Sequence, residues 1–308
     1  MTGKKSEKFY KSLLRYKWVI KPLQNQLLAP KTSIRVGGPA DVVITISNEI
    51  ELINVWTLMN REKIPWFVLG KGTNLLVKDR GFPGAAVVLK GSFLEIEYRD
   101  NQLIAGAGAT SKKLSEFAKQ NNLSGIEFLS TIPGTVGGAV TMNAGAHGSQ
   151  MKDIIEWVRF LNHDGNIEIL KKNQLGFSYR HSFFSDISSI ILKAGFVLKN
   201  DKLENIADRE EKMRQERKKT QPVGKHTWGS VFVNPPNHSA GQLIESCNLK
   251  GRGFGKAIIS PKHANFIENT GGATFEDLMK TIELAKTMVF NKYNILLKME
   301  GKIVPEEE

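Results

Sequence analysis

The sequence contains a single cysteine, Cys247, and no run approaching the ~18 apolar residues that a membrane-spanning helix requires. One thiol cannot form a disulfide within the chain and does not offer the ligand spacing of a zinc site, so we expect a reducing compartment and no metal. The lysine-rich segment 1–17 is not followed by the apolar core of a signal peptide. These absences predict a cytoplasmic protein without a membrane partner.

Acidic residues are also comparatively few: 31 against 43 basic residues, which gives a net charge of +12. Such an excess is compatible with nucleic acid, a membrane surface or an anionic small substrate. The densest basic segment, residues 209–225, also contains Glu210, Glu211 and Glu216. This alternation is more typical of a solvated helix with i,i+4 ion pairs than of a phosphate-binding stripe. Because no nucleic-acid-binding motif is recognisable either, we expect no nucleic-acid partner.

Glycine is concentrated in two segments that indicate a bound anion. Residues 132–148 read IPGTVGGAVTMNAGAHG, with five glycines, three alanines and only His147 able to ionise near neutrality. Residues 68–77 read VLGKGTNLLV, a glycine turn between strand-like apolar residues. Backbone N–H groups in such turns can approach an anion closely because no Cβ atoms intervene. Two such turns suggest a dinucleotide cofactor, although either alone would often be an ordinary tight turn.

Neither glycine turn fits the Rossmann fingerprint. The turn Gly70–Asn74 lacks a third glycine and leads into the strand-like residues 75–77, whereas a Rossmann turn opens a helix that binds the pyrophosphate. The segment Gly106–Gly108 precedes a helix but lacks both the third glycine and a well-placed acidic partner. We therefore favour a fold in which backbone amides of two loops, rather than a helix dipole, bind the pyrophosphate.

The pattern of apolar residues predicts an α+β protein with two domains and an N-terminal arm. Residues 1–30 are the arm, 31–205 a cofactor domain with lobes of about 31–92 and 93–205, and 206–308 a compact α+β domain. Helices are expected over 49–62, over 206–219, over 240–247, from Thr110 or Ser111 onward, and from Thr274 onward. Strands are expected over 42–46, 66–69, 85–89, 103–107, in two runs within 154–170, over 189–198 and over 230–233.

Several ordered motifs resemble the UDP-N-acetylenolpyruvoylglucosamine reductase family. They are RVGGPAD (35–41), the turn from Gly70 to Leu75, IPGTVGGA (132–139) with NAGA (143–146), YRHS (179–182), TQP (220–222), GSVFVNP (229–235), AGQLIE (240–245), residues 260–269, and Glu300. The likeness covers nearly the whole chain from about residue 30, in the same order. It implies the FAD-binding fold of vanillyl-alcohol oxidase and p-cresol methylhydroxylase, followed by a substrate domain.

The resemblance implies non-covalently bound FAD and NADPH as electron donor. It assigns to the cofactor Arg35, Gly70, Lys71, Gly72, Thr73, Asn74, Leu75, Pro133, Gly134, Thr135, Val136, Gly137, Ala139, Asn143 and Gly145. It assigns to the substrate, a UDP-sugar, the residues Tyr179, Gln221, Asn234, His263 and Lys302. Asn234 before a proline can equally set a turn, and His263 can equally be a packing residue.

The implied reaction reduces an enolpyruvyl ether to a lactyl ether, which adds a hydride at one carbon and a proton at the other. Arg180 is matched to the stabilisation of charge on the substrate carboxylate, since a guanidinium offers a fork of donors. Ser230 resembles the family's proton donor, and Glu300 matches its acidic residue. Taken singly, Arg180 could be a surface arginine, Ser230 a strand-start serine and Glu300 a solvated carboxylate.

The chain departs from the family pattern at Lys31, where asparagine is usual, and at Lys302, where arginine is common. Between Arg180 and residue 206 it has no tyrosine and little spare length, which predicts the shorter type without a tyrosine-bearing lid. We expect a monomer. Two alternatives stay open: an oxidase of the same fold with flavin attached through His147, and a basic nucleic-acid-associated protein that uses residues 1–20 and 209–225.

Overall fold

The computed structural model describes residues 3–305, and side chains from Lys5 onward. The chain divides into two compact units, neither of which is continuous in sequence. Unit 1 comprises the residues up to Gln24, Val42–Gly70 and Gly84–Glu216. Unit 2 comprises Asn25–Asp41, Lys71–Pro83 and the residues from Arg217 onward.

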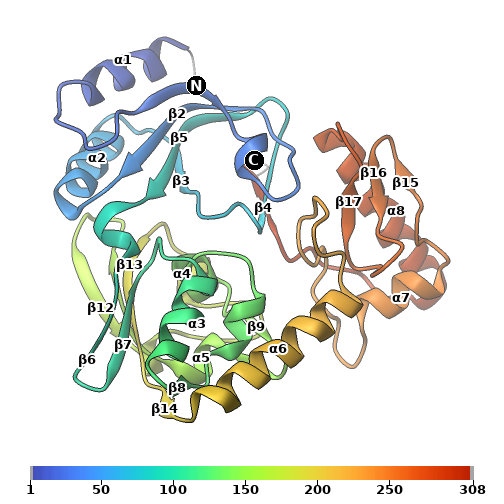
Figure 1. The fold of residues 1–308 in the computed structure, drawn as a ribbon. Helices are drawn as coiled ribbons and strands as arrows, with labels where there is room; N and C mark the ends of the chain where they lie inside the picture. The colour runs from blue at the N-terminus through green and yellow to red at the C-terminus, as the bar shows by residue number, and fades with distance from the viewer. Residues whose placement is uncertain (1–2, 306–308) are drawn as a thin grey trace. The chain divides into compact units, whose positions relative to one another are not determined.

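A four-stranded sheet with strand order β1-β2-β5-β3 lies beside helix α2 (Figure 1). The Asn48 side chain caps α2 by accepting the Glu51 N–H at 2.9 Å, and the helix buries the face that includes Leu52, Val55 and Met59. Each such side chain contributes about 1.5–3 kcal/mol to stability when fully buried. The bounds are α1 Gly3–Leu13, β1 Leu23–Leu27, β2 Pro39–Ile46, α2 Glu49–Arg61, β3 Trp66–Val68 and β5 Phe82–Leu89.

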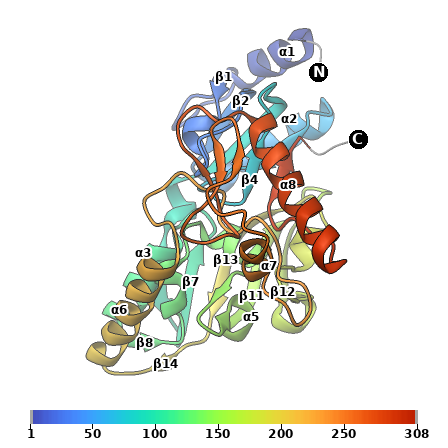
Figure 2. The same ribbon diagram turned by 90° about the vertical axis from the view of Figure 1, so that its right-hand side faces the viewer.

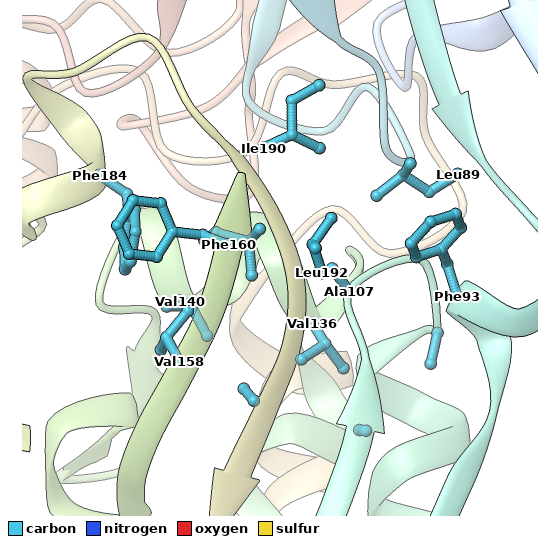
Figure 3. Packing of buried hydrophobic residues seen from close by; sticks show 14 of the residues in the cluster. Leu89, Phe93, Ala107, Val136, Val140, Val158, Phe160, Phe184, Ile190 and Leu192 are labelled. Atoms are coloured by element: carbon cyan, nitrogen blue, oxygen red, sulfur yellow. The ribbon is translucent and has the colours of Figure 1, made fainter. Parts of the chain in front are cut away.

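A five-stranded antiparallel sheet, ordered β12-β11-β13-β7-β6, lies entirely within unit 1. The short helix α4 inserts Val136 and Val140 into the same buried cluster as Leu192 and Phe160 (Figure 3). Phe160 also meets Phe184 edge-on, with ring centroids 5.1 Å apart. The bounds are β6 Ile96–Arg99, β7 Gln102–Gly106, α3 Ser111–Gln120, α4 Val136–Thr141, β11 Ile155–Leu161, β12 Ile167–Lys171 and β13 Ile190–Phe196.

Short elements connect these layers. They are the 3₁₀ turns η1 Ala29–Lys31, η2 Gly91–Leu94, η3 Glu127–Thr131, η4 Lys172–Gln174 and η5 Phe183–Ser185, the helix α5 Met151–Ile154, and the paired strands β8 Leu123–Ser124 with β14 Lys199–Asn200 and β9 Gly145–Ala146 with β10 Ser149–Gln150. The β9-β10 hairpin follows α4 directly and thus ends the glycine-rich segment 132–148.

Helix α6, Leu203–Thr220, is the charged helix expected from the sequence, but it is not uniformly solvated. Glu210 is buried and accepts hydrogen bonds from Ser115 Oγ at 2.6 Å and Lys119 Nζ at 2.7 Å. Arg209 beside it donates to Glu127 at 2.7 Å. These contacts fasten α6 to α3 and η3, so the local charge alternation was misleading for this part of the helix.

In unit 2, α7 (Ala240–Ser246) packs against α8 (Phe275–Tyr293), as Figure 2 shows. The predicted start of α8 at Thr274 is confirmed by a capping box: Thr274 Oγ1 accepts the Asp277 N–H at 3.0 Å, and Asp277 Oδ2 accepts the Thr274 N–H at 3.1 Å. The strands are β15 Gly253–Phe254, β16 Ala257–Ile259 and β17 Ile267–Asn269 in one sheet, and β4 Leu75–Val77 parallel to β18 Lys302–Val304.

Three local expectations are wrong. Residues 230–233 form no strand and contribute only an isolated bridge between Phe232 and Met299. The glycine-rich segment 132–148 is not all loop, since residues 136–141 form α4. The helix expected over 240–247 ends at Ser246, so Cys247 is the C-cap of α7, where it is only partly buried.

A search of the described helices finds none that is long and apolar enough to cross a membrane. The same residues contain no cluster of three or more metal-ligating side chains.

Candidate functional site

The two glycine turns meet in unit 1 at Gly70 and Thr135. A Cβ atom built on Gly70 would lie 2.7 Å from the Thr135 hydroxyl oxygen, closer than real Cβ contacts allow. Thr135 is the N-cap of α4 and accepts the Gly138 N–H at 3.4 Å. Glycine is therefore required at position 70 because of the second turn rather than because of its own dihedral angles.

The first turn, between β3 and β4, leaves backbone donors unused. Gly72 has φ +60, and a Cβ atom there would lie 2.4 Å from the Lys31 carbonyl oxygen. Among the described residues, no hydrogen bond uses the backbone N–H of Gly70, Lys71 or Gly72. Unused N–H groups in a side-chain-poor turn are what a pyrophosphate needs, so this turn fits a dinucleotide such as FAD.

The second turn offers fewer donors than the sequence suggests. Val136, Gly137 and Ala139 give their N–H groups to the carbonyl oxygens of Ala109, Ala107 and Thr135, at 2.8–2.9 Å. In the described part of the chain, the N–H groups of Gly134 and Thr135 have no such partner. An anion at this turn would thus meet two backbone donors at its entrance.

Asn143 has no exposed surface, and its side chain is engaged within the protein. Its Nδ2 donates to Gln150 Oε1 and to the Ser178 carbonyl oxygen, both at 2.8 Å, and its Oδ1 accepts the Lys152 N–H at 3.0 Å. Asn143 also has φ +40. The residue therefore shapes the backbone of the glycine segment, and its amide is not available to a cofactor.

Arg180 is joined to this glycine segment. It occupies the left-handed region at φ +59, and its Nη2 donates to the Gly145 carbonyl oxygen at 3.2 Å. Its Cζ lies 5.1 Å from the ring centroid of Tyr179, which is 53% exposed. The Ser182 hydroxyl fastens the same turn by donating to the Thr141 carbonyl oxygen at 2.7 Å. The guanidinium is thereby held next to the proposed cofactor segment within unit 1.

Ser230 and Glu300 are neighbours through the backbone of unit 2. The Glu300 N–H donates to the Val231 carbonyl oxygen at 2.9 Å, which places residue 300 beside the segment that carries Ser230. Trp228, two residues before Ser230, is buried, and a Cβ atom on Gly301 would lie 2.4 Å from its ring. The Lys302 N–H donates to the Asn74 carbonyl oxygen at 3.0 Å, so the first glycine turn joins the same cluster.

The sequence missed the residue that holds this segment in place. Asn265 is 5% exposed, its side chain bonds both backbone groups of Phe232, and its carbonyl oxygen accepts the Val231 N–H at 2.8 Å. The motif 260–269 was recognised, but no local pattern marks Asn265, because its partners lie far away in sequence.

The remaining candidate residues differ in whether their side chains already form hydrogen bonds within the protein. Asn234 Oδ1 accepts the Ala240 N–H at 3.0 Å and so forms the turn before α7. His263 Nδ1 accepts the Asn265 N–H at 3.2 Å, and burial lowers the pKa of this imidazole below its usual value. Arg35, at φ +60, donates to the Pro30 carbonyl oxygen at 2.8 Å. Gln221 is partly buried, and Lys302 is exposed.

Two protein-family models match the chain, one in its N-terminal part and one in its C-terminal part. Residues 40–171 match a family model described as FAD binding domain, and residues 221–304 match UDP-N-acetylenolpyruvoylglucosamine reductase, C-terminal domain. The chain is 42% identical to the protein named UDP-N-acetylenolpyruvoylglucosamine reductase of Caldanaerobacter subterraneus subsp. tengcongensis, over 92% of this chain and 93% of that protein. It is 39% identical to the protein of the same name from Bacillus pumilus, over 93% of this chain and 95% of that protein. The crystal structure of such a reductase from Thermus caldophilus superposes with a TM-score of 0.80 at 35% identity, covering 92% of this chain and 98% of that one.

Proposed function

The chain belongs to the UDP-N-acetylenolpyruvoylglucosamine reductase family and is an FAD-dependent oxidoreductase, and from this premise we propose that it reduces UDP-N-acetylglucosamine enolpyruvate to UDP-N-acetylmuramate, with NADPH as electron donor. The predicted α+β fold, an FAD-binding domain followed by a family-specific C-terminal domain, is confirmed. The observation that carries the proposal is the close approach of Gly70 to Thr135 beside unused backbone N–H groups.

The protein's share in cofactor binding is a cradle of backbone groups. The N–H groups of Gly70, Lys71, Gly72, Gly134 and Thr135 would hold the pyrophosphate of FAD. When bound, FAD supplies the hydride that the reaction requires.

Arg180, Ser230 and Glu300 are the residues that we assign to the substrate. A hydride added to the terminal methylene carbon leaves negative charge on the carbon that bears the carboxylate, and this charge delocalises into the carboxylate. The Arg180 guanidinium stabilises that charge. The Ser230 hydroxyl delivers the proton to the same carbon, which completes the lactyl ether. Glu300 holds the enolate in orientation or shares its proton.

The UDP portion of the substrate is assigned to polar side chains that can still be reached. Tyr179 and Lys302 are exposed, and Gln221 is partly buried. Asn234 and His263 each have one polar atom engaged within the protein, so they would contact the substrate only through their remaining donors. We place the enzyme in the cytoplasm, as a monomer.

The experiment that tests this function follows NADPH oxidation by the purified protein at 340 nm, with and without UDP-N-acetylglucosamine enolpyruvate. We expect a yellow protein whose NADPH consumption depends on that substrate and yields the lactyl ether. Denaturation should release the flavin into the supernatant, because the proposal requires no covalent bond to His147. Flavin that stays with the precipitate, together with oxidation of a sugar or alcohol, would instead identify an oxidase.

A further inference from the structure

Half of the chain's net charge lies in its first 24 residues. This segment carries seven Lys and Arg residues against a single glutamate, a net charge of +6 out of +12. It belongs to unit 1 and contributes nothing to the site described above. A concentration of one sign this strong produces a local field that attracts polyanions.

The basic side chains line a groove between α1 and α2. The groove has a volume of ≈ 760 Å³ and is lined by five basic residues, Lys5, Lys8, Lys11, Arg15 and Arg61, against two acidic ones, Glu7 and Glu62, and by Ser12. Lys11 pairs with Glu7 and Arg61 with Glu62, but no ion pair among the described residues involves Lys8, Arg15, Lys17 or Lys21. We call this surface the basic groove.

The chain that follows α1, which contributes Arg15 to the basic groove, also exposes apolar side chains. We call Leu14, Tyr16, Val19, Ile20 and Leu23 the apolar rim; all five are exposed, and Val19 is 71% exposed. Large apolar side chains gathered at a surface mark an interaction site more often than chance.

Helix α2 extends the apolar rim. The Val19 N–H donates to Glu51 Oε1 at 2.8 Å, which fixes the rim beside the start of α2. There the neighbouring Ile50 is 75% exposed, and Ile53 is exposed as well. Helix α1 itself cannot supply the apolar contact, because its Phe9 and Leu13 are buried in the core.

We propose that the basic groove and the apolar rim together bind the surface of a membrane that contains anionic lipids. The unpaired cations suit lipid phosphates, and short aliphatic side chains beside them suit the boundary between headgroups and acyl chains. Nucleic acid fits this surface less well, because four of the five rim residues are aliphatic and offer no ring on which a base can stack. Adsorption to a surface needs no membrane-spanning helix, so the proposal agrees with the absence of one among the described residues. It departs from our expectation, drawn from the lack of long apolar runs, that the protein has no membrane partner.

The test is flotation of the flavin-loaded full chain with vesicles of phosphatidylcholine alone or with 30% phosphatidylglycerol. We expect binding only to the anionic vesicles, and a loss of binding in 0.5 M salt. Each basic residue near an anionic surface is worth about fivefold in partitioning, so the triple variant K8E/R15E/K17E should lose at least a hundredfold. The variant V19S/I20S, which keeps the charge, should also lose binding, by about tenfold or more.

Matched controls carry the same changes elsewhere in unit 1. K171E/K199E/K202E removes three exposed lysines, and I169S/L203S removes two exposed aliphatic side chains. Both controls should float like the unchanged protein, and all variants should keep their flavin spectrum and NADPH oxidation, which shows that they are folded. The proposal is overturned by equal binding to neutral vesicles, or by controls that lose as much binding as the rim and groove variants.

The same variants distinguish an anionic membrane from two other ligands of the basic groove and the apolar rim, nucleic acid and a second copy of the chain. Binding to a single-stranded oligonucleotide that is lost in K8E/R15E/K17E but unchanged in V19S/I20S, with no vesicle binding, would assign the groove to nucleic acid and overturn the proposal. A dimer that V19S/I20S dissociates, again without vesicle binding, would assign the rim to a second copy of the chain and overturn it as well.

Discussion

The side-chain amide of Asn265 makes with Phe232 the two hydrogen bonds of a neighbouring strand: Oδ1 accepts the Phe232 N–H at 3.0 Å, and Nδ2 donates to the Phe232 carbonyl oxygen at 2.8 Å. Both residues are buried, so neither backbone group of Phe232 can turn to water. Ser230 lies two residues before Phe232. Its position therefore depends on an amide that does not itself belong to the proposed chemistry.

Replacing Asn265 by alanine should separate stability from catalysis. The loss of both hydrogen bonds leaves the backbone N–H and carbonyl groups of Phe232 without partners and should lower the free energy of unfolding by about 1–3 kcal/mol. If Asn265 positions Ser230, substrate-dependent flavin reoxidation should fall at least tenfold, while flavin reduction by NADPH stays unchanged in stopped-flow measurements.

Asn269 provides the control. It is similarly buried in unit 2 and also forms long-range bonds, including one from Nδ2 to the Ile34 carbonyl oxygen at 2.9 Å, but in the described part of the chain no hydrogen bond joins it to Phe232. Asn269→Ala should cost similar stability without the selective loss of reoxidation. A selective loss in both variants would show that the effect is general destabilisation.

Replacing Gly70 by alanine should weaken FAD binding by at least tenfold, because the new Cβ would press on the Thr135 hydroxyl and force the two glycine turns apart. Fluorescence titration of the apoprotein with FAD measures the affinity. Gly138→Ala is the control: its Cβ would lie at an ordinary 3.5 Å, and alanine is the better helix residue in α4.

The double variant Gly70→Ala, Thr135→Ala should recover part of the lost FAD affinity, since it removes the oxygen that the new methyl group meets. If Gly70→Ala binds FAD normally, the close approach of the turns is not what forms the cradle.

Ser230→Ala should leave flavin reduction by NADPH intact and abolish reoxidation by the enolpyruvyl substrate, since only the second step needs the serine proton. Stopped-flow absorbance near 450 nm follows both half-reactions. Ser239→Ala, which removes the N-cap of α7 in the same unit, should change neither. Normal reoxidation in Ser230→Ala would remove this hydroxyl from the mechanism.

Asp201 should make stability depend on pH in the acid range. Hydrogen bonds from Asn205 and Arg209 lower the pKa of its carboxyl group to about 2. A carboxyl group with a lowered pKa stabilises the fold above its unfolded pKa of about 3.9, and that contribution is lost as the pH falls toward 2. Urea unfolding between pH 7 and 2.5 should therefore show a shallower acid decline for Asp201→Asn than for the unchanged protein. Asp208→Asn, at an exposed position on α6 itself, should decline like the unchanged protein.

Patterns among neighbouring residues predicted most helices and strands. The features that the sequence did not predict depend on contacts between residues that are far apart in the chain. The cap of α8 could be read from Thr274 and Asp277, because a capping box involves residues three apart. Glu210 looked solvated because its partners, Ser115 and Lys119, are about ninety residues away. Residues 230–233 were expected to form a strand because Val231, Phe232 and Val233 are β-branched or aromatic, but the segment bonds to a side-chain amide and forms only a single bridge.

The candidate site shows the same division. The family motifs led to the glycine turns and to Ser230, Arg180 and Glu300, whose roles stay predictions. No pattern in the sequence shows that the N–H groups of Val136 and Gly137 donate to the carbonyl oxygens of Ala109 and Ala107. These hydrogen bonds depend on how the turn packs against β7 and α3.

Because β4 pairs in parallel with β18, the protein can finish folding only after both strands have been synthesised. Leu75 pairs with Lys302 and Val77 with Val304, so a strand made early in translation remains unpaired until residues 302–304 have left the ribosome. Until then Leu76, which is fully buried in the finished protein, has an open edge beside it. Nascent chains stalled before residue 302 should accordingly recruit chaperones at this edge, whereas chains released after Val304 should not.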